Sequence, residues 1–235
     1  MPNLVVLRRE MVEVGRLLEI KGLIVAAEGN LSVRLGGHTF LVTPAGGHKG
    51  ALKARDLVEV DLQGRGIQRR GIQGCRVPGR RIQKRPTSEW PLHREIYSLR
   101  PDIGAICHAH PPWATAFATA GRDLDGNLLT ETAALLPRVP VAPRSLPGTE
   151  EVPASIRPFI KDHDAVLLAN HGAVCVGGSL REAYDMMQTV ERLAQVTLLT
   201  QLAELAAGHD KLDQGLLAQN GLDWEMLLRL VKGSL

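Results

Sequence analysis

The chain has 235 residues, 44% of them hydrophobic and 23% charged, so it can bury the core of one domain or of two small ones. Only eight side chains are aromatic, so we expect an aliphatic core. No apolar stretch could span a membrane, and Arg8, Arg9 and Glu10 interrupt the region where a signal peptide would be apolar, so we expect a cytoplasmic protein. The formal net charge is +3, but eight basic and no acidic residues lie between Gly64 and Arg85, and without them 20 basic residues face 25 acidic ones. This uneven distribution argues against a uniformly basic face for nucleic acid.

The first half of the chain predicts one helix, three strands and a basic segment. Apolar residues recur at helical spacing from Leu7 to Leu18, and Gly22 can end that helix. Two alternating apolar stretches flank Gly36-Gly37, which predicts a hairpin. The predicted elements are a helix over 4–21, strands over 31–35, 39–42 and 57–62, and a Gly/Arg-rich loop or loose hairpin over 64–85.

The second half alternates helices with strands and has no linker-like break. Ser88 can cap a helix that ends before Pro101, and Ser179 can cap a long helix. The predicted helices span 89–99, 111–119, 149–160 and 179–207, with one or two short helices after them, and the predicted strands span 103–107, 139–142, 165–169 and 173–176. We therefore expect one α/β domain over residues 1–235.

Two histidines at the end of a predicted strand form the first candidate site. In a strand, residues two apart point to the same face, so His108 and His110 present both imidazoles together. His171 ends another predicted strand and precedes Gly172, which allows a close approach of the backbone. Three neutral imidazoles suit Zn²⁺ and leave a fourth position for substrate. The alternative is a chance His-x-His pair whose side chains are exposed or cap the strand ends.

A carboxylate and three small-residue loops could complete such a site. Glu89 is either a general acid/base near the metal or a carboxylate that stabilises a helix N-terminus. The loops at Glu28–Ser32, Thr43–Gly47 and Thr87-Ser88 offer backbone N–H groups and hydroxyls to a phosphate, although such turns are often only turns. No dinucleotide fingerprint, phosphate-loop motif or nucleophile elbow is present, which disfavours those chemistries.

Five short segments together resemble the class II aldolases of the aldolase/adducin family, close to the L-fuculose-phosphate aldolases. Their order and separations fit the family from about residue 5 to 205. The segments are Glu28–Ser32, Thr43–Gly46, Pro86–Trp90, Arg100–Pro111 and Leu168–Gly172. The resemblance implies a three-layer αβα sandwich with a central, mainly antiparallel sheet.

The resemblance also implies roles for individual residues. His108, His110 and His171 correspond to three zinc ligands, with one Zn²⁺ per subunit or another divalent metal in its place. Glu89 corresponds to the catalytic acid/base, which can be a fourth ligand in the resting state. The positions that correspond to phosphate-binding residues are Gly29, Asn30, Ala45, Gly46, Thr87 and Ser88. Ala45 stands where relatives often carry Ser or Thr.

The implied activity is a reversible aldol cleavage. A ketose 1-phosphate would give dihydroxyacetone phosphate and an aldehyde through a metal-stabilised enediolate, in a homotetramer with active sites between subunits. Similar epimerases carry Asp at the position of Glu89, which favours aldol chemistry here. No nucleic acid and no membrane are expected as partners.

Two other functions stay open. A same-fold dehydratase of the methylthioribulose-1-phosphate type, or a decarboxylase of a sugar-acid phosphate, would use the same metal and a related intermediate. An adducin-like interaction module would instead use the basic loop at about 64–85 to contact an acidic partner, but it would not need three histidines and Glu89. That loop is either a solvated insertion or a guide for anionic substrates.

Overall fold

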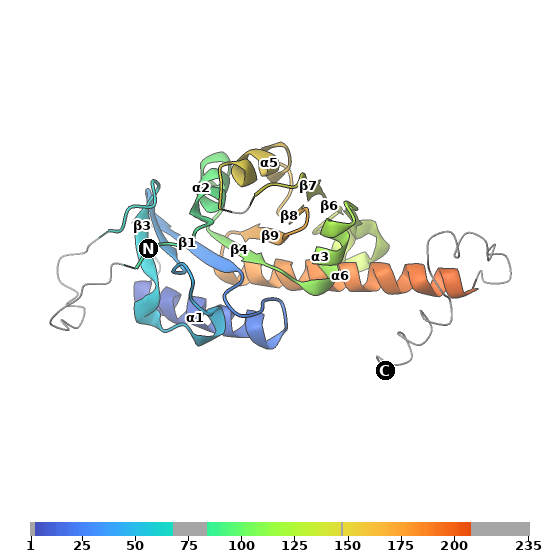
Figure 1. The fold of residues 1–235 in the computed structure, drawn as a ribbon, viewed down its shortest axis with the longest axis horizontal. Coiled ribbons are helices and arrows are strands. Elements are labelled where there is room, and N and C mark those ends of the chain that lie inside the picture. The colour runs from blue at the N-terminus through green and yellow to red at the C-terminus, as the bar shows by residue number, and fades with distance from the viewer. Residues whose placement is uncertain (1–2, 68–83, 147, 208–235) are drawn as a thin grey trace. The chain divides into compact units, whose positions relative to one another are not determined.

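A mixed sheet of seven strands forms the centre of the fold, and a separate pair of strands lies outside it (Figure 1). The sheet contains β1 (Asn30–Gly36), β2 (Thr39–Val42), β3 (Val58–Asp61), β4 (Ala105–Ala109), β7 (Val141–Ala142), β8 (Ala165–Leu168) and β9 (Gly172–Gly177), and the pair is β5 (Leu124–Asp125) with β6 (Arg138–Val139). Along the sheet the order is β3-β2-β1-β4-β9-β8-β7, and neighbours are antiparallel except β7 and β8. This computed structural model describes residues 3–67, 84–146 and 148–207.

Helices cover both faces of the sheet. They are α1 (Leu4–Ile20), α2 (Trp90–Leu99), α3 (Pro112–Thr119), α4 (Thr130–Ala133), α5 (Glu151–Ile160) and α6 (Leu180–Ala207), with 3₁₀ turns η1 (Lys49–Ala51), η2 (Ala54–Asp56) and η3 (Gly126–Leu128). Helices α2 and α5 lie on one face, and α1, α3 and the first part of α6 lie on the other (Figure 1). This confirms the predicted three-layer α/β fold with a mainly antiparallel sheet.

The core between the sheet and helices α2 and α5 is mostly aliphatic, as the composition predicts. Phe40, Ile106 and Val174 from the sheet are fully buried against side chains of the helices. Ile96 of α2 and Ile156 of α5 are also fully buried there. Full burial of one such side chain contributes roughly 1.5–3 kcal/mol. The central strand β4 is buried along its whole length, so its position is strongly determined.

Six strand ends meet at one edge of the sheet. Because neighbouring strands alternate in direction, β1 and β9 begin at this edge, while β2, β4, β8 and the parallel β7 end at it. The edge therefore gathers the segments Gly29-Asn30, Thr43–Gly46, His108–His110, Asn170-His171 and Arg144. All the strand-end residues singled out from the sequence lie on it.

The strand predicted over 139–142 is two strands. Pro140 separates them, because proline has no N–H to donate to a ladder. Val139 pairs with β5 and Val141 with β8, so the two halves belong to different sheets. The short elements β5, η3 and α4 were not predicted, since two to four residues are too few to show a periodicity.

Helix α2 begins one residue later than predicted and without the predicted Ser88 cap. Glu89 occupies the N-cap position, and its side chain makes no capping bond. Thr87 Oγ1 instead accepts the backbone N–H of Glu89 at 3.3 Å. The carboxylate of Glu89 is therefore directed elsewhere.

The chain divides into two compact units, Met1–Gln195 and Val196–Leu235. Of the second unit, residues 196–207 are described, and they form the end of α6. The short helices predicted after α6, and residues 68–83 of the predicted basic loop, lie outside the described residues. Within the described ranges, none of the helices combines the length and the apolar character that crossing a membrane requires.

Candidate active site

Three histidines converge at the edge of the sheet. His108 lies in β4, His110 follows that strand, and His171 lies in the turn between β8 and β9. One nitrogen atom of each lies within 4.8 Å of the others. His110 Nε2 is 3.2 Å from His108 Nε2. Since imidazole nitrogens at this separation can share one cation, the three predicted ligands form a candidate metal site.

The backbone around His171 explains how β8 and β9 bring it close to β4. A Cβ atom at Gly172 would lie 2.4 Å from the carbonyl oxygen of Ala109 and 2.8 Å from Cδ2 of His110, so only glycine fits. Asn170 has φ +59°, a left-handed conformation that Asn tolerates better than most residues. The turn therefore depends on Asn170 and Gly172 together.

Hydrogen bonds direct the ring nitrogens of two of these histidines. His108 is fully buried, and its Nδ1 lies 2.9 Å from the carbonyl oxygen of Ala173, which requires a proton on Nδ1 and makes Nε2 the atom that faces Glu89 and His110. His110 Nδ1 lies 3.4 Å from Glu28 Oε1. Burial and the neighbouring His108 and His171 lower the pKa of His110 to about 4, so its ring is neutral at neutral pH. Both arrangements suit metal ligation.

Glu89 lies against two of the histidines. Its Oε2 is 3.0 Å from His108 Nε2, and its Oε1 is 3.2 Å from His171 Nε2. Burial raises the pKa of Glu89, but the charges and hydrogen bonds of His108 and His171 outweigh this and lower it far below its usual range. Burial lowers the pKa of His108, whereas Glu89 raises it, and the net direction is upward. The site therefore holds an ionised carboxylate beside the candidate metal position.

The loops predicted to bind phosphate lie beside each other. Thr87 N–H donates to the carbonyl of Thr43 at 3.0 Å, and Ala45 N–H donates to the carbonyl of Arg85 at 3.1 Å. A cavity of about 700 Å³ opens at Ala45 and Gly46. The other residues lining it include His48, Asp56, Lys84 and Arg85. Two of the backbone donors are thus already occupied, while basic side chains stand nearby.

Three other predicted residues occupy different surroundings. Gly29 has φ +67°, and a Cβ there would lie 2.9 Å from the carbonyl oxygen of His108, so glycine is required beside β4. Asn30 is buried, and its side-chain Nδ2 donates to Glu89 Oε2 at 2.6 Å. Ser88 is exposed. The structure therefore brings Asn30 to the acid/base candidate rather than to the cavity at Ala45.

Two further buried polar residues lie near the site. Lys49 is 3% exposed, and its Nζ donates to the carbonyl of Ala27 at 2.5 Å. Burial lowers the pKa of Lys49, and the nearby Glu89 acts in the opposite direction. His93 is fully buried and contacts Asn30. The signal for His93 was its position four residues after Glu89, on the same side of a helix.

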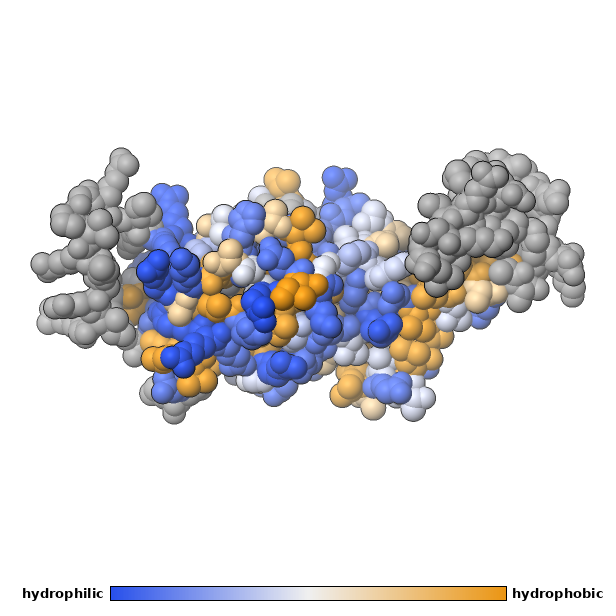
Figure 2. Space-filling view, turned by 90° about the horizontal axis from the view of Figure 1, so that it is seen from below, coloured by the Kyte–Doolittle hydropathy of each residue, from blue (hydrophilic) through white to orange (hydrophobic). Residues whose placement is uncertain are grey.

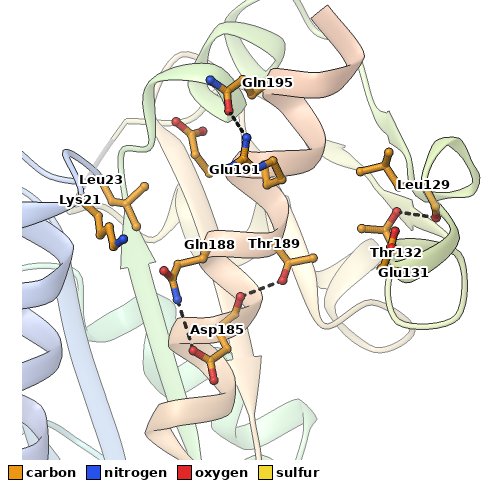
Figure 3. A pocket seen from close by; sticks show the side chains of 11 residues that line it. Lys21, Leu23, Leu129, Glu131, Thr132, Asp185, Gln188, Thr189, Glu191 and Gln195 are labelled. Atoms are coloured by element: carbon orange, nitrogen blue, oxygen red, sulfur yellow. Dashed lines mark hydrogen bonds between the residues drawn. The ribbon is translucent and has the colours of Figure 1, made fainter. Parts of the chain in front are cut away.

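Of two other cavities, one is lined in part by His171 and the other by none of the three histidines. One of about 340 Å³ reaches His171 and is lined by Arg144, Ser145 and Asn170, among others. Another, of about 590 Å³, lies along α6 and is drawn in Figure 3. Its polar groups bond one another, as when Gln188 donates to Asp185, and none of the three histidines lines it.

A comparison with known families identifies the chain. The sequence model of the family described as "Class II Aldolase and Adducin N-terminal domain" matches residues 9–198. The chain belongs to the class II aldolase and adducin family. Enzymes of this family depend on a metal ion, and the three-histidine cluster fits that requirement. The resemblance of the five sequence segments is therefore confirmed.

Relatives in this family carry different activities in their names. An L-fuculose phosphate aldolase of Methanocaldococcus jannaschii is 31% identical over 84% of this chain and 98% of its own. A 3-oxo-tetronate 4-phosphate decarboxylase of Pectobacterium atrosepticum is 32% identical over 82% and 84%. A methylthioribulose-1-phosphate dehydratase of Methylococcus capsulatus is 28% identical over 78% and 89%. The chain therefore belongs to a family of enzymes, but the family alone does not decide between aldol cleavage, decarboxylation and dehydration.

Solved structures of the family match the fold. The crystal structure of the L-fuculose-1-phosphate aldolase from Thermus thermophilus has a TM-score of 0.71 and is 35% identical, covering 84% of this chain and 95% of that one.

Proposed function

We propose that this protein is a zinc-dependent aldolase that reversibly cleaves a small ketose 1-phosphate to dihydroxyacetone phosphate and an aldehyde. The observation that supports this best is Glu89, an ionised carboxylate within 3.0 Å and 3.2 Å of two histidines of a three-nitrogen cluster. An acid/base group beside a metal position is what aldol chemistry needs. The proposal covers residues 1–235 as one such enzyme.

Three histidines would bind the metal ion, and Glu89 would transfer the proton. His108, His110 and His171 would hold the ion, with Glu89 as a fourth ligand at rest. The bound ion supplies a Lewis acid for negative charge on substrate oxygens. In cleavage, Glu89 would take up the proton that the substrate hydroxyl releases as the carbon–carbon bond breaks and deliver it to the substrate carbon. In condensation it would remove the proton from that carbon. Because this carboxylate is held on both oxygens, it can meet the carbon in a defined direction.

Phosphate recognition would orient the substrate on one side of the metal. The backbone N–H of Gly46 and the hydroxyls of Thr87 and Ser88 would contact the phosphate. Arg85 and Lys84, the latter paired with Asp56, line the cavity beside Ala45. Gly29 and Asn30 would contact the phosphate from the side of Glu89, to which Asn30 donates. His48, which lines the cavity at Ala45, would compensate for the hydroxyl that Ala45 lacks.

The other end of the substrate would lie toward β7 and β8. There the cavity at His171 is lined by Arg144 and Ser145, across the metal position from the phosphate loops. Arg144 also favours a second candidate function, decarboxylation of a sugar-acid phosphate, because its guanidinium would bind a carboxylate. Dehydration of a ketose phosphate would use the same metal and Glu89.

The assembly and location follow the same proposal. We infer a homotetramer with active sites between subunits, in the cytoplasm. Light scattering should give about four times the 25.5 kDa mass of one chain. A monomer with full activity would contradict the shared sites.

Metal analysis followed by a substrate panel tests the function. Purified protein should contain about one Zn²⁺ per chain, and His108→Ala should lose it. A panel of ketose 1-phosphates is then assayed for release of dihydroxyacetone phosphate, and sugar-acid phosphates are assayed for CO₂. Folded protein that binds no metal would exclude all three enzyme functions, and CO₂ release alone would select the decarboxylase.

A further inference from the structure

A row of buried polar side chains leads from helix α2 to Glu89. Tyr97 OH lies 2.9 Å from Ser32 Oγ, which lies 2.6 Å from His93 Nδ1. On the other side of the ring, His93 Nε2 lies 2.5 Å from Asn30 Oδ1. Asn30 Nδ2 then donates to Glu89 Oε2 at 2.6 Å. Four side chains that are at most 3% exposed thus connect in one line to the acid/base candidate.

This row lies where apolar side chains would be expected. The ring of Phe40 is 4.6 Å from that of Tyr97, and the ring of Trp90 stacks 6.3 Å from that of His93. Burying polar groups costs free energy unless each one is hydrogen-bonded. The row meets that condition at every ring nitrogen and hydroxyl oxygen of Ser32 and His93. A polar chain kept inside a core suggests a role other than stability.

The amide of Asn30 determines the direction of every bond in the row. Its NH₂ group donates to Glu89 Oε2, which leaves Oδ1, an acceptor, to face His93. His93 must then carry its proton on Nε2, and its Nδ1 accepts from Ser32. Ser32 in turn accepts from Tyr97. Each residue therefore donates toward Glu89.

The charge state of His93 agrees with this order. Burial lowers the pKa of His93 to about 3, so the ring is neutral under ordinary conditions. A neutral imidazole has one donor and one acceptor, which is the number that the row requires.

We propose that His93 is a positioning residue that fixes the amide of Asn30 and, through it, the carboxylate of Glu89. This inference rests on the proposed role of Glu89 as acid/base. Asn30 is on β1, whereas His93 and Glu89 belong to α2 and its N-cap, so the row also connects the strand to the helix start. Without the donor at His93, the Asn30 amide has no fixed orientation, and its oxygen can turn toward the carboxylate.

Variants at His93 and at the far end of the row test the proposal. In His93→Leu we expect kcat per zinc-loaded chain to fall about 10–100-fold, the scale for losing a group that orients an active-site ligand, while KM changes little. In His93→Gln, whose side-chain NH₂ can still donate to Asn30, kcat should recover in part. Tyr97→Phe removes only the far donor and should have a smaller effect. Ser98→Ala, an exposed site on α2, is the matched control and should match the parent protein.

The kinetic outcome separates positioning from a purely structural role. A merely structural His93 would lower the folded fraction and the zinc content, but not kcat per zinc-loaded chain. Unchanged kcat in His93→Leu, or a rise in KM alone, would overturn the proposal.

A second measurement needs neither substrate nor variant. Nitrogen-15 NMR of the histidine rings in the zinc-loaded protein should show His93 as the Nε2–H form near neutral pH. The Nδ1–H form, or a charged ring, would overturn the proposal even in a protein that cleaves ketose phosphates. An enzyme that cleaves none of them but shows the Nε2–H form would refute the aldolase function and leave the row intact.

Discussion

At the scale of single residues, burial and neighbouring charges have opposite effects on the ionisation of the site's side chains. Burial opposes ionisation of Glu89, yet the adjoining histidines keep it charged. Burial also keeps His110 neutral, with a pKa of about 4. An ionised carboxylate and a neutral imidazole of His110 in one site supply a proton acceptor and a metal ligand.

Glu89→Gln should separate metal binding from catalysis. The amide keeps the size of the side chain but cannot take up the proton, so turnover should fall roughly 10²-fold or more while about one Zn²⁺ per chain remains. Zinc content and kcat are measured on the same samples. Glu95→Gln on α2, which removes the charge that pairs with Arg157 of α5, is the matched control. Full activity in Glu89→Gln would exclude the acid/base role.

Much of this residue set could be predicted from the sequence. The i, i+2 spacing of His108 and His110 shows that they share a face, because strand geometry alone determines it. The partners of Asn30 could not be predicted, since a phosphate contact and a contact with Glu89 use the same amide. The burial of Lys49 was also hidden, because it depends on α1 packing over η1.

At the scale of elements, helices and strands follow the sequence patterns closely. The hairpin of β1 and β2 turns at the two predicted glycines, and Ser179 caps α6 by accepting the N–H of Glu182 at 3.2 Å. The errors lie where local patterns are ambiguous. Pro140 divides an apolar stretch between two sheets, and the start of α2 uses Glu89 rather than Ser88. Tertiary pairing decided both cases.

Packing of α2 on β1 should make stability depend on pH through His93. The unfolded ring takes up a proton near pH 6.5 and the folded ring only near 3, so unfolding is favoured as pH falls through that interval. The slope is at most ~1.4 kcal/mol per pH unit. Denaturant unfolding from pH 7 to 4 should therefore show a steeper loss in the parent protein than in His93→Gln. Parallel curves would mean that His93 titrates normally in the folded state.

At the scale of the whole molecule, charge is distributed unevenly along the sequence. Hydrophilic and hydrophobic residues are interspersed on the face drawn in Figure 2. The basic segment between Gly64 and Arg85 precedes the Thr87–Glu89 turn, and Lys84 and Arg85 line the cavity at Ala45. This arrangement connects the basic charge to an anionic substrate more directly than to nucleic acid. Aromatic side chains are few, so the proposed recognition of substrate would depend on metal, backbone amides, hydroxyls and cations.

Deleting residues 66–80 tests whether the basic segment guides substrate. We expect kcat/KM at low salt to fall and its dependence on ionic strength to weaken, because four arginines that attract phosphate are lost. The measurement is kcat/KM between low and physiological salt, with zinc content as the control for folding. An unchanged salt response would mean that the segment is a solvated insertion.

The sequence by itself determined the α/β class, the family and the three histidines with Glu89, because periodicity and short motifs depend on neighbours along the chain. Only the tertiary structure decided that His171 meets His108 across β4 and β9, and that Tyr97, Ser32, His93 and Asn30 line up behind Glu89. These contacts join residues about 60 positions apart. Such pairs arise from strand register and helix packing, which no local pattern specifies.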